Sequence, residues 1–314
     1  MANYLVTGGS GFIGSNIVRE LLDRGDSVRV LDNFSTGRRA NLAGVESKID
    51  LIEGDICDAH TVKRAAADMD YVLHQAALPS VPRSVKDPVE SLQVGVIGTA
   101  NVLLAALDAK VKRVVYAASS SAYGDQEGDF KIETMLPNPL SPYASAKLTG
   151  EQLCAVFTNC YGLETVSLRY FNVFGPHQDP TSEYSAVIPL FITAVLEDRQ
   201  PIFFGDGLQT RDFTYVTNNV HANIVAATSD KGSGQVFNIA CGGSYSLRDL
   251  LAAINKALGT SVEARMEPAR VGDVRHSMAD IEKAKNILGY AVKTPFEEGI
   301  RKTVEWYKEN RDAW

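Results

Sequence analysis

The sequence of 314 residues predicts an α/β protein with a doubly wound parallel sheet and a second, smaller α/β lobe. Short apolar, β-branched runs alternate with helical patterns through the first half of the chain, which is typical of buried parallel strands joined by crossover helices. A glycine-rich turn, Thr7 to Gly14, also follows the first strand and opens the first helix. Both observations are typical of the Rossmann arrangement.

The strands of the predicted sheet are the apolar runs at residues 4–6, 27–31, 49–53, 71–74, 113–117 and 165–169. Segments with helical periodicity separate them, and the predicted helices cover residues 15–24, 61–67, 88–109 and 143–160. Right-handed crossovers place such helices on both faces of the sheet.

Beyond about Tyr170 the alternation gives way to longer loops, where the second lobe begins. Its expected elements are a helix at 186–197, a strand at 202–204, a strand and a helix within 212–227, a strand at 237–240 and helices at 246–257 and 281–288. The predicted domains are residues 1–171, which bind a dinucleotide and are rejoined by about 212–240, and residues 172–314, which bind the substrate. No Pro-rich or Gly-rich linker separates them, so we expect a cleft between closely packed lobes.

Charge and composition exclude several functions. The chain has 31 Lys and Arg against 38 Asp and Glu, a net charge of −7, which gives a non-specific nucleic-acid or anionic lipid surface no electrostatic support. No apolar run approaches the roughly 20 residues of a membrane helix, and no basic, apolar leader is present. We therefore expect a cytoplasmic protein without nucleic-acid or membrane partners. The four cysteines lack metal-ligand spacing, which favours buried thiols over disulfides or a metal site.

The glycine-rich turn predicts a dinucleotide site. Gly8, Gly11 and Gly14 let the backbone turn sharply and let a pyrophosphate approach the positive end of the first helix. The spacing is GxxGxxG rather than GxGxxG, and by itself it also fits an ordinary strand-helix turn. Asp32, eighteen residues beyond Gly14, favours the dinucleotide because its carboxylate can accept both ribose hydroxyls of an adenosine.

The same carboxylate repels a 2′-phosphate, so NAD is favoured over NADP as the cofactor. Arg38 and Arg39 lie nearby and are the remaining argument for NADP. Asp55 and Ile56 follow the third strand at the carboxyl edge of the sheet, where the adenine can be flanked.

Tyr143 and Lys147 form the predicted catalytic pair. They lie four residues apart near the start of a helix, so both side chains project from one face. We expect the ammonium to lower the pKa of the phenol toward the working pH, which makes tyrosine a usable acid and base. Ser119 to Ser121 follow the strand 113–117, and the Ser119 hydroxyl can orient the substrate oxygen. A surface Tyr–Lys pair and turn-forming serines are the alternatives.

Further motifs stand along nearly the whole chain: His74-Gln75-Ala76-Ala77, Tyr143-Ala144-Ser145-Ala146-Lys147, Arg169-Tyr170-Phe171-Asn172-Val173-Phe174-Gly175-Pro176, Gly205-Asp206-Gly207, Arg211-Asp212-Phe213 and Arg270-Val271-Gly272-Asp273. With the glycine-rich turn and the serines, they resemble the extended short-chain dehydrogenases/reductases, specifically the nucleotide-sugar 4-epimerases of the UDP-glucose and UDP-N-acetylglucosamine group.

The resemblance implies two sets of binding residues and three catalytic ones, Tyr143, Lys147 and Ser119. It implies NAD contacts from Gly8, Gly11, Phe12, Ile13, Gly14, Asp32, Asn33, Asp55, Ile56, Gln75, Ala76, Ala77, Tyr143, Lys147 and Tyr170. It implies a UDP-sugar site built from Ser119, Ser120, Ser121, Tyr143, Asn172, Val187, Arg211, Arg270, Asp273 and Ser277. It also implies a homodimer with a four-helix contact, for which helices 88–109 and 143–160 are candidates.

The implied activity is NAD-dependent 4-epimerisation through a 4-keto sugar. The family spacing places the residue near the sugar 2-substituent at Ser277, and a small residue there favours UDP-GlcNAc and UDP-GalNAc, with UDP-Glc and UDP-Gal as additional substrates. One departure is Gly95, where the family usually has an asparagine, whose role is left vacant or passes to Gln93.

Three alternatives remain open at this stage. A strict UDP-glucose 4-epimerase would share the same motifs. Dehydratases and decarboxylases of the family place acidic residues where this chain has Ser120 and Ser121, and reductases usually prefer NADPH. A protein of another class, a non-catalytic NAD-sensing relative, would be expected to lose the Tyr143–Lys147 pair, which this chain keeps.

Overall fold

A computed structural model describes residues 1–126, 128, 130–181, 186–269 and 275–311. Its centre is a seven-stranded sheet in the order β11-β6-β5-β4-β1-β2-β3, with every neighbouring pair parallel, which confirms the predicted doubly wound sheet. The strands are β1 (Asn3–Thr7), β2 (Ser27–Asp32), β3 (Asp50–Glu53), β4 (Tyr71–His74), β5 (Arg113–Ser119), β6 (Thr165–Tyr170) and β11 (Gln235–Ile239).

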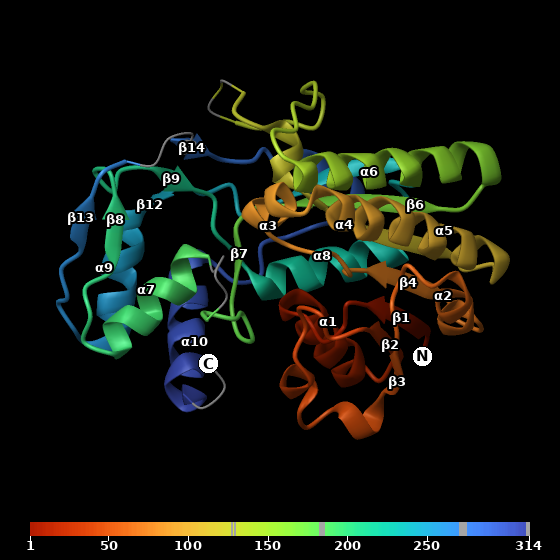
Figure 1. The fold of residues 1–314 in the computed structure, drawn as a ribbon, viewed down its shortest axis with the longest axis horizontal. Helices are drawn as coiled ribbons and strands as arrows, with labels where there is room; N and C mark the ends of the chain where they lie inside the picture. The colour runs from red at the N-terminus through yellow and green to blue at the C-terminus, as the bar shows by residue number, and fades with distance from the viewer. Residues whose placement is uncertain (127, 129, 182–185, 270–274, 312–314) are drawn as a thin grey trace.

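Helices cover both faces of this sheet (Figure 1). One face carries α1 (Phe12–Asp23) and α8 (Val216–Thr228), which contact each other. The other carries α2 (Ala59–Ala66), α5 (Thr99–Asp108) and α6 (Pro142–Tyr161). Strand order reverses between β1 and β4, and in doubly wound sheets the ligand crevice lies outside the carboxyl ends of the strands at such a point.

The helix that carries the Tyr–Lys pair has clear boundary signals. The Ser141 hydroxyl accepts a hydrogen bond from the Ala144 N–H, Pro142 occupies the first turn, and Gly162 ends the helix in the left-handed conformation. These signals fix the start of α6, so both residues of the pair lie in its first two turns.

The smaller lobe is built from short strands and helices. Its strands pair as β7 (Val173–Phe174) with β10 (Thr214–Tyr215), as β12 (Tyr245–Ser246), β9 (Thr210–Arg211) and β14 (His276–Ser277) in one sheet, and as β13 (Arg265–Glu267) with β8 (Ile202–Phe204). Its helices are α7 (Val187–Leu196), α9 (Leu247–Leu258) and α10 (Phe296–Glu309). Short 3-10 and π turns are η1 (Arg39–Leu42), η2 (Glu46–Lys48), η4 (Ser120–Tyr123) and η5 (Ala284–Leu288).

The chain enters the central sheet a second time through α8 and β11. Strand β11 pairs with β6 from Gln235↔Val166 to Ile239↔Tyr170, and α8 packs against β4, β5 and β6. The last strand of the dinucleotide lobe is therefore contributed by a segment that follows part of the smaller lobe in sequence.

Two helices were not predicted from the sequence. The C-terminal helix α10 buries Phe296, Ile300, Val304 and Tyr307, a helical repeat of apolar positions, and its first turn carries acidic residues. The signal was therefore present in the sequence. Helix α3 (Val81–Lys86) is a short turn whose start Ser80 caps.

The predicted helix at 88–109 is interrupted. It is formed by α4 (Pro88–Leu92), the π-turn η3 (Gln93–Gly98) and α5. Together these span Pro88–Asp108, 21 residues that are long and apolar enough, by length and composition alone, to cross a membrane. The expectation that no segment approaches this limit is therefore corrected. Of an apolar 18-residue stretch within this segment, 39% is buried inside the protein. Part of the apolar character therefore serves packing, which includes contacts with α6.

Candidate functional site

The glycine turn has the geometry that a pyrophosphate requires. Gly8 has φ +70°, and a Cβ there would lie 2.6 Å from the Ala76 amide nitrogen. A Cβ on Gly14 would collide with the Gly8 carbonyl oxygen. Gly11 caps α1 without a side-chain hydrogen bond, and the first turn of α1 carries no acidic residue. The positive end of α1 is therefore left for an anion, and Phe12 and Ile13, both half-buried, line this first turn.

The buried Asp32 ends β2 beside this turn. One of its carboxylate oxygens accepts a hydrogen bond from the Ser10 N–H at 2.9 Å, and the other accepts one from the Phe34 N–H at 2.8 Å. A carboxylate offers about four lone-pair sites, so both oxygens can still accept ribose hydroxyls. The Ser10 hydroxyl is buried and has no hydrogen-bond partner among the described residues. These residues fit the adenosine end of NAD.

The residues expected around the adenine come together at the same edge. The Asn33 amide donates to the Asp55 carboxylate at 2.8 Å, and Ile56 packs against Gly98, where a Cβ would lie 2.6 Å from its Cδ1. Arg38 forms an ion pair with Asp179 at 2.6 Å.

A buried polar cluster connects the carboxyl ends of β4 and β6 with α8. The Tyr170 hydroxyl donates to Gln75 Oε1 at 3.1 Å and accepts from Asn223 Nδ2 at 2.7 Å, while Gln75 Nε2 donates to Asn223 Oδ1 at 2.9 Å. Burial raises the pKa of Tyr170 to about 12, so the hydroxyl stays neutral. Ala76 and Ala77 follow Gln75 in the same loop and are half-buried. Asn223, which is one of three buried asparagines on α8, with Asn218 and Asn219, was not identified from the sequence.

The predicted catalytic residues meet at the carboxyl end of β5. The Ser119 hydroxyl hydrogen-bonds to the Tyr143 phenol, and it also accepts from the Ser121 hydroxyl at 2.9 Å. Lys147 is buried, and its ammonium donates to the Ala117 carbonyl at 2.6 Å. Ser120 begins the turn η4 and is half-buried.

The expected effect of Lys147 on the phenol is corrected by the structure. Burial raises the pKa of Tyr143, and the hydrogen bond with Ser119 opposes this shift. Burial also lowers the pKa of Lys147 to about 8. Desolvation therefore determines the direction of both shifts, and the lowering of the phenol pKa that the spacing of the two residues suggested is not found. A lower phenol pKa requires additional positive charge in the crevice.

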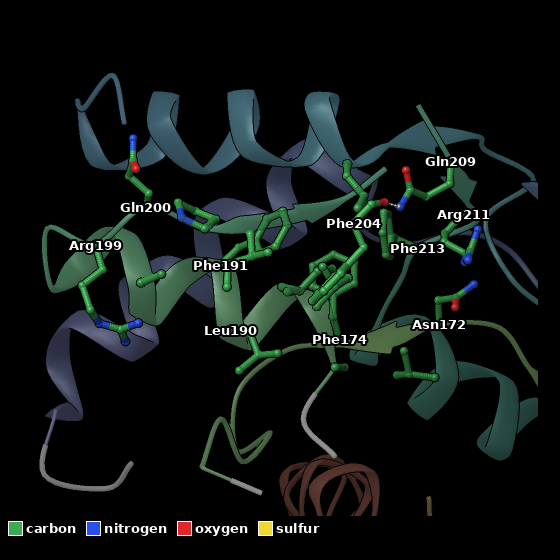
Figure 2. A pocket seen from close by; sticks show the side chains of 18 residues that line it. Asn172, Phe174, Leu190, Phe191, Arg199, Gln200, Phe204, Gln209, Arg211 and Phe213 are labelled. Carbon is green, nitrogen blue, oxygen red and sulfur yellow. Dashed lines mark hydrogen bonds between the residues drawn. The ribbon is translucent and has the colours of Figure 1, made fainter. Parts of the chain in front are cut away.

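A cavity of about 530 Å³ lies in the smaller lobe (Figure 2). Asn172 and Arg211 lie at one end, Arg199 and Gln200 at the other, and aromatic side chains lie between them. Val187, from the start of α7, also lines it. The three predicted substrate residues Asn172, Val187 and Arg211 are thus brought together.

The small β12-β9-β14 sheet places Ser277 beside Arg211. Ser277 pairs with Arg211 in parallel register, and its carbonyl accepts from the Asp212 N–H at 2.9 Å. The buried Asp212 carboxylate accepts from the backbone N–H groups of Cys241 at 3.0 Å and Gly242 at 2.9 Å. Sequence reasoning quoted Asp212 only as part of a motif, yet this carboxylate connects the loops that surround Arg211. The predicted substrate residues Arg270 and Asp273 lie outside the described residues.

Among the described residues no group of His, Cys, Asp and Glu side chains has the arrangement of a metal site. All four cysteines are free, and the expectation of buried thiols holds only for Cys154: Cys160 is exposed, and Cys57 and Cys241 are half-buried.

The site combines a dinucleotide-binding turn, a Tyr–Lys–Ser cluster at the carboxyl end of β5 and a cavity that ends in cationic and amide side chains. This combination defines an enzyme of the Rossmann class that acts on a bound small molecule. More specifically, the chain belongs to the NAD dependent epimerase/dehydratase family, whose model matches residues 4–240.

Individual relatives agree with this assignment. The UDP-glucose 4-epimerase of Mycolicibacterium smegmatis is 40% identical over 308 residues, covering 97% of this chain and 98% of the relative. The solved UDP-N-acetylglucosamine 4-epimerase of Methanobrevibacter ruminantium M1, in complex with UDP-N-acetylmuramic acid, is 39% identical, with a TM-score of 0.93 and 98% coverage of both chains. The UDP-glucose 4-epimerase of Thermus thermophilus, in complex with NAD, is 37% identical, with a TM-score of 0.88 and coverage of 98% and 99%.

These comparisons confirm three predictions. The resemblance to extended nucleotide-sugar 4-epimerases is confirmed, the cofactor is NAD, and the enzyme class is isomerase.

Proposed function

We propose that this chain interconverts the C4 epimers of UDP-linked sugars, with UDP-GlcNAc and UDP-GalNAc favoured and UDP-Glc and UDP-Gal also accepted. The class of UDP-sugar 4-epimerase is supported by the relatives. The observation that carries the proposal is that one chain combines the Ser119–Tyr143–Lys147 cluster, at the carboxyl end of β5, with a cavity in the smaller lobe that ends at Asn172 and Arg211. A guanidinium and an amide suit diphosphate oxygens.

Bound NAD supplies the acceptor and donor of hydride at sugar C4. Ser119 orients the 4-hydroxyl by a hydrogen bond, and Tyr143 takes the proton of that hydroxyl as its C–O bond becomes a carbonyl. Lys147 holds positive charge next to the phenol when protonated. The 4-keto sugar then presents its other face, and Tyr143 returns the proton to the oxygen as C4 regains hydride with inverted configuration. The chain's own contribution is positioning and preorganised charge.

Preference for N-acetyl sugars rests on Ser277. Its backbone is fixed beside Arg211 by the β9–β14 pairing, and its side chain is small, which leaves room for a 2-acetamido group. A dehydratase or decarboxylase is disfavoured because Ser120 and Ser121, in η4, offer no carboxyl group next to Ser119.

The test is to incubate the purified protein with UDP-GlcNAc and, separately, with UDP-Glc, without added cofactor, and to separate the products by chromatography. Formation of the C4 epimer from either substrate supports the class, and faster conversion of UDP-GlcNAc supports the preference. Ser277→Tyr is expected to reduce N-acetyl turnover far more than glucose turnover, while the matched control Ser277→Ala leaves their ratio unchanged. Equal losses for both sugars in Ser277→Tyr would remove the argument from size.

We further propose that two copies join through α4–α5 and α6. Exposed apolar side chains gather on these helices, among them Val89, Leu92, Leu104 and Val156, and Val89 is 74% exposed. Exposed apolar patches of this kind are typical of subunit contacts. Sedimentation of the wild type and of Val89→Glu tests this: a dimer that dissociates in the variant supports the proposal, whereas a wild-type monomer, or binding of the wild type to neutral lipid vesicles, contradicts it.

A further inference from the structure

The Lys147 ammonium is buried between strand β5 and helix α6. Only 6% of the residue is exposed, its Nζ donates to the Ala117 carbonyl at 2.6 Å, and it lies 5.0 Å from the centre of the Tyr116 ring. A buried ammonium has three donors to satisfy and a charge to compensate. Two adjacent residues of β5 meet these needs: the Ala117 carbonyl accepts a hydrogen bond, and the face of the Tyr116 ring compensates the charge.

Among the described residues around Lys147, the titratable side chains do not perform this compensation. Burial lowers the pKa of His74 to about 3 and raises that of Cys154 to about 12, and it raises the pKa of Tyr116 and of Tyr143 above 10. These side chains, which face Lys147 from β4, β5 and α6, are therefore neutral between pH 7 and 8. Besides the Ala117 carbonyl, the face of the Tyr116 ring thus supplies the negative potential next to the ammonium.

The carboxylate of Glu151, one turn along α6 from Lys147, is already engaged. Arg169 binds it with two hydrogen bonds, at 2.7 and 2.8 Å, and both side chains are buried.

The Tyr116 ring is fixed from several sides. Its hydroxyl forms a hydrogen bond with Thr99 and lies 3.4 Å from the Lys147 carbonyl oxygen. A Cβ on Gly150 would collide with that hydroxyl, so glycine leaves the space that the phenol fills. The His74 ring packs 5.6 Å from the ring of Tyr116, and Thr99 holds His74 Nε2 at 3.1 Å.

We propose that Tyr116 is a positioning residue for the reaction: its ring face holds the Lys147 ammonium against the Ala117 carbonyl, on the face of α6 that carries Tyr143. The proposal rests on the proposed function, because only there does Lys147 act on the phenol. A ring that leaves its place would let the ammonium turn away or lose its proton. The hydroxyl of Tyr116 serves only to hold the ring.

The test compares Tyr116→Leu, which removes the ring, with Tyr116→Phe, which keeps it. At pH 8 we expect kcat to fall ten- to a hundredfold in Tyr116→Leu with KM nearly unchanged, and the alkaline limb of the kcat profile to move about one pH unit lower. Tyr116→Phe is expected to stay within twofold of wild type, with an unchanged profile. Tyr71→Leu is the matched control, because it removes a similar ring beneath the exposed Lys112, 5.8 Å away at the other end of the sheet.

A second measurement does not depend on turnover. The Cε resonances of the lysines are followed by NMR during a pH titration, and the Lys147 signal is assigned by its loss in Lys147→Met. We expect its midpoint near pH 8 in the wild type and in Tyr116→Phe, and about one unit lower in Tyr116→Leu. If Tyr116→Leu does not fold, Tyr116→Met replaces it, because methionine is similar to leucine in volume and also lacks a ring.

The outcomes separate the two proposals. If wild-type protein converts no UDP-sugar but its Lys147 titration moves as expected in Tyr116→Leu, the proposed function fails and the contact with Tyr116 stands. An unchanged midpoint and pH profile in Tyr116→Leu would overturn the positioning role. So would an equal effect of Tyr116→Phe, because the ring is then not the part that matters.

Discussion

The dinucleotide crevice and the substrate cavity are assembled in different ways. The glycine turn, α1 and Asp32 form one βαβ unit, and their contacts arise within 32 residues of sequence. The cavity is lined by Asn172, which follows β6, and by Arg211 of β9, and Ser277 of β14 pairs with Arg211. Arg211 and Ser277 lie 66 residues apart in sequence and meet only because β9 and β14 pair. The first site is therefore a local structure, and the second depends on the packing of distant segments.

One segment connects the two lobes. This segment comprises residues 176–179. The Pro176 carbonyl accepts a hydrogen bond from the Asn16 amide of α1, and the Gln178 carbonyl accepts one from the Tyr307 hydroxyl of α10. Asp179 forms an ion pair with Arg38. In Figure 1 the chain after β7 lies between α10 and α1. These polar contacts add to a hydrophobic core that is continuous through both lobes and includes Ile17 of α1, Ile192 of α7 and Ile300 of α10.

The largest expected effect is that of Tyr143→Phe in the dinucleotide lobe. It removes the hydroxyl that moves the proton and keeps the ring, so we expect kcat to fall about a thousandfold while NAD stays bound. Steady-state turnover and the absorbance of bound cofactor measure both quantities. The matched control is Tyr161→Phe at the exposed end of the same helix, which is expected to leave kcat unchanged. Full epimerisation by Tyr143→Phe would remove the acid-base assignment.

The next effect is confined to the substrate lobe. Asp212→Asn replaces an oxygen that accepts backbone N–H groups with an amide that donates, and we expect a loss of about 2–3 kcal/mol in the free energy of unfolding. KM for the UDP-sugar should rise about tenfold, because the loops around Arg211 lose their connection. Calorimetry and NAD titration check this. Asp206→Asn, at an exposed ion pair with Arg275, is the control. A comparable loss of NAD affinity would mean that the lobes are not independent.

A smaller effect follows from the buried Lys147. Its pKa is lowered from 10.5 to about 8, so the unfolded chain binds more protons between these values, and this group's contribution to stability increases with pH across that window. At pH 7 Lys147→Met should therefore be more stable than the wild type by about 2 kcal/mol, after loss of the hydrogen bond to Ala117.

That advantage should disappear near pH 10.5. Thermal unfolding of both proteins at pH 7 and above pH 10 measures the difference, and an advantage that does not change with pH would show that charge is not its cause. Because Lys147 loses its proton above about pH 8, kcat of the wild type should decline there as well.

The smallest effect concerns the joint between the lobes. The Arg38–Asp179 pair is partly exposed, so a double-mutant cycle with Arg38→Ala and Asp179→Ala should give a coupling of about 0.5–1 kcal/mol in the free energy of unfolding. The exposed pair of Lys63 and Asp108 within the dinucleotide lobe is the control. A coupling several times larger would mean that the two lobes act as one cooperative unit.

Local patterns predicted most of the central sheet. Each strand before Tyr170 is a short apolar run, and the cap at Ser141 and the turn at Gly162 give α6 its boundaries. Helix α10 was not predicted, although its apolar positions repeat with helical spacing. In the second lobe, the regular alternation of strands and helices that guided the prediction of the first lobe is absent from the sequence.

The chemistry of the site was harder to predict from the sequence than the fold. The spacing of Tyr143 and Lys147 predicted contact on one helix face, but it could not predict that burial raises the pKa of one and lowers that of the other. Desolvation depends on what covers a side chain, here strands β4 and β5. The same applies to Asn223 and Asp212, whose roles depend on partners far away in sequence.

The sequence by itself determined the glycine turn, the acidic end of the second strand and the helix with its Tyr–Lys pair, because each is a property of a few adjacent residues and of backbone geometry. Only the tertiary structure decided how strongly those groups are buried, which ring lies beside the Lys147 ammonium, and how Arg211 and Ser277 become neighbours. These features come from contacts between segments far apart in the chain, and neither residue spacing nor composition reports such contacts.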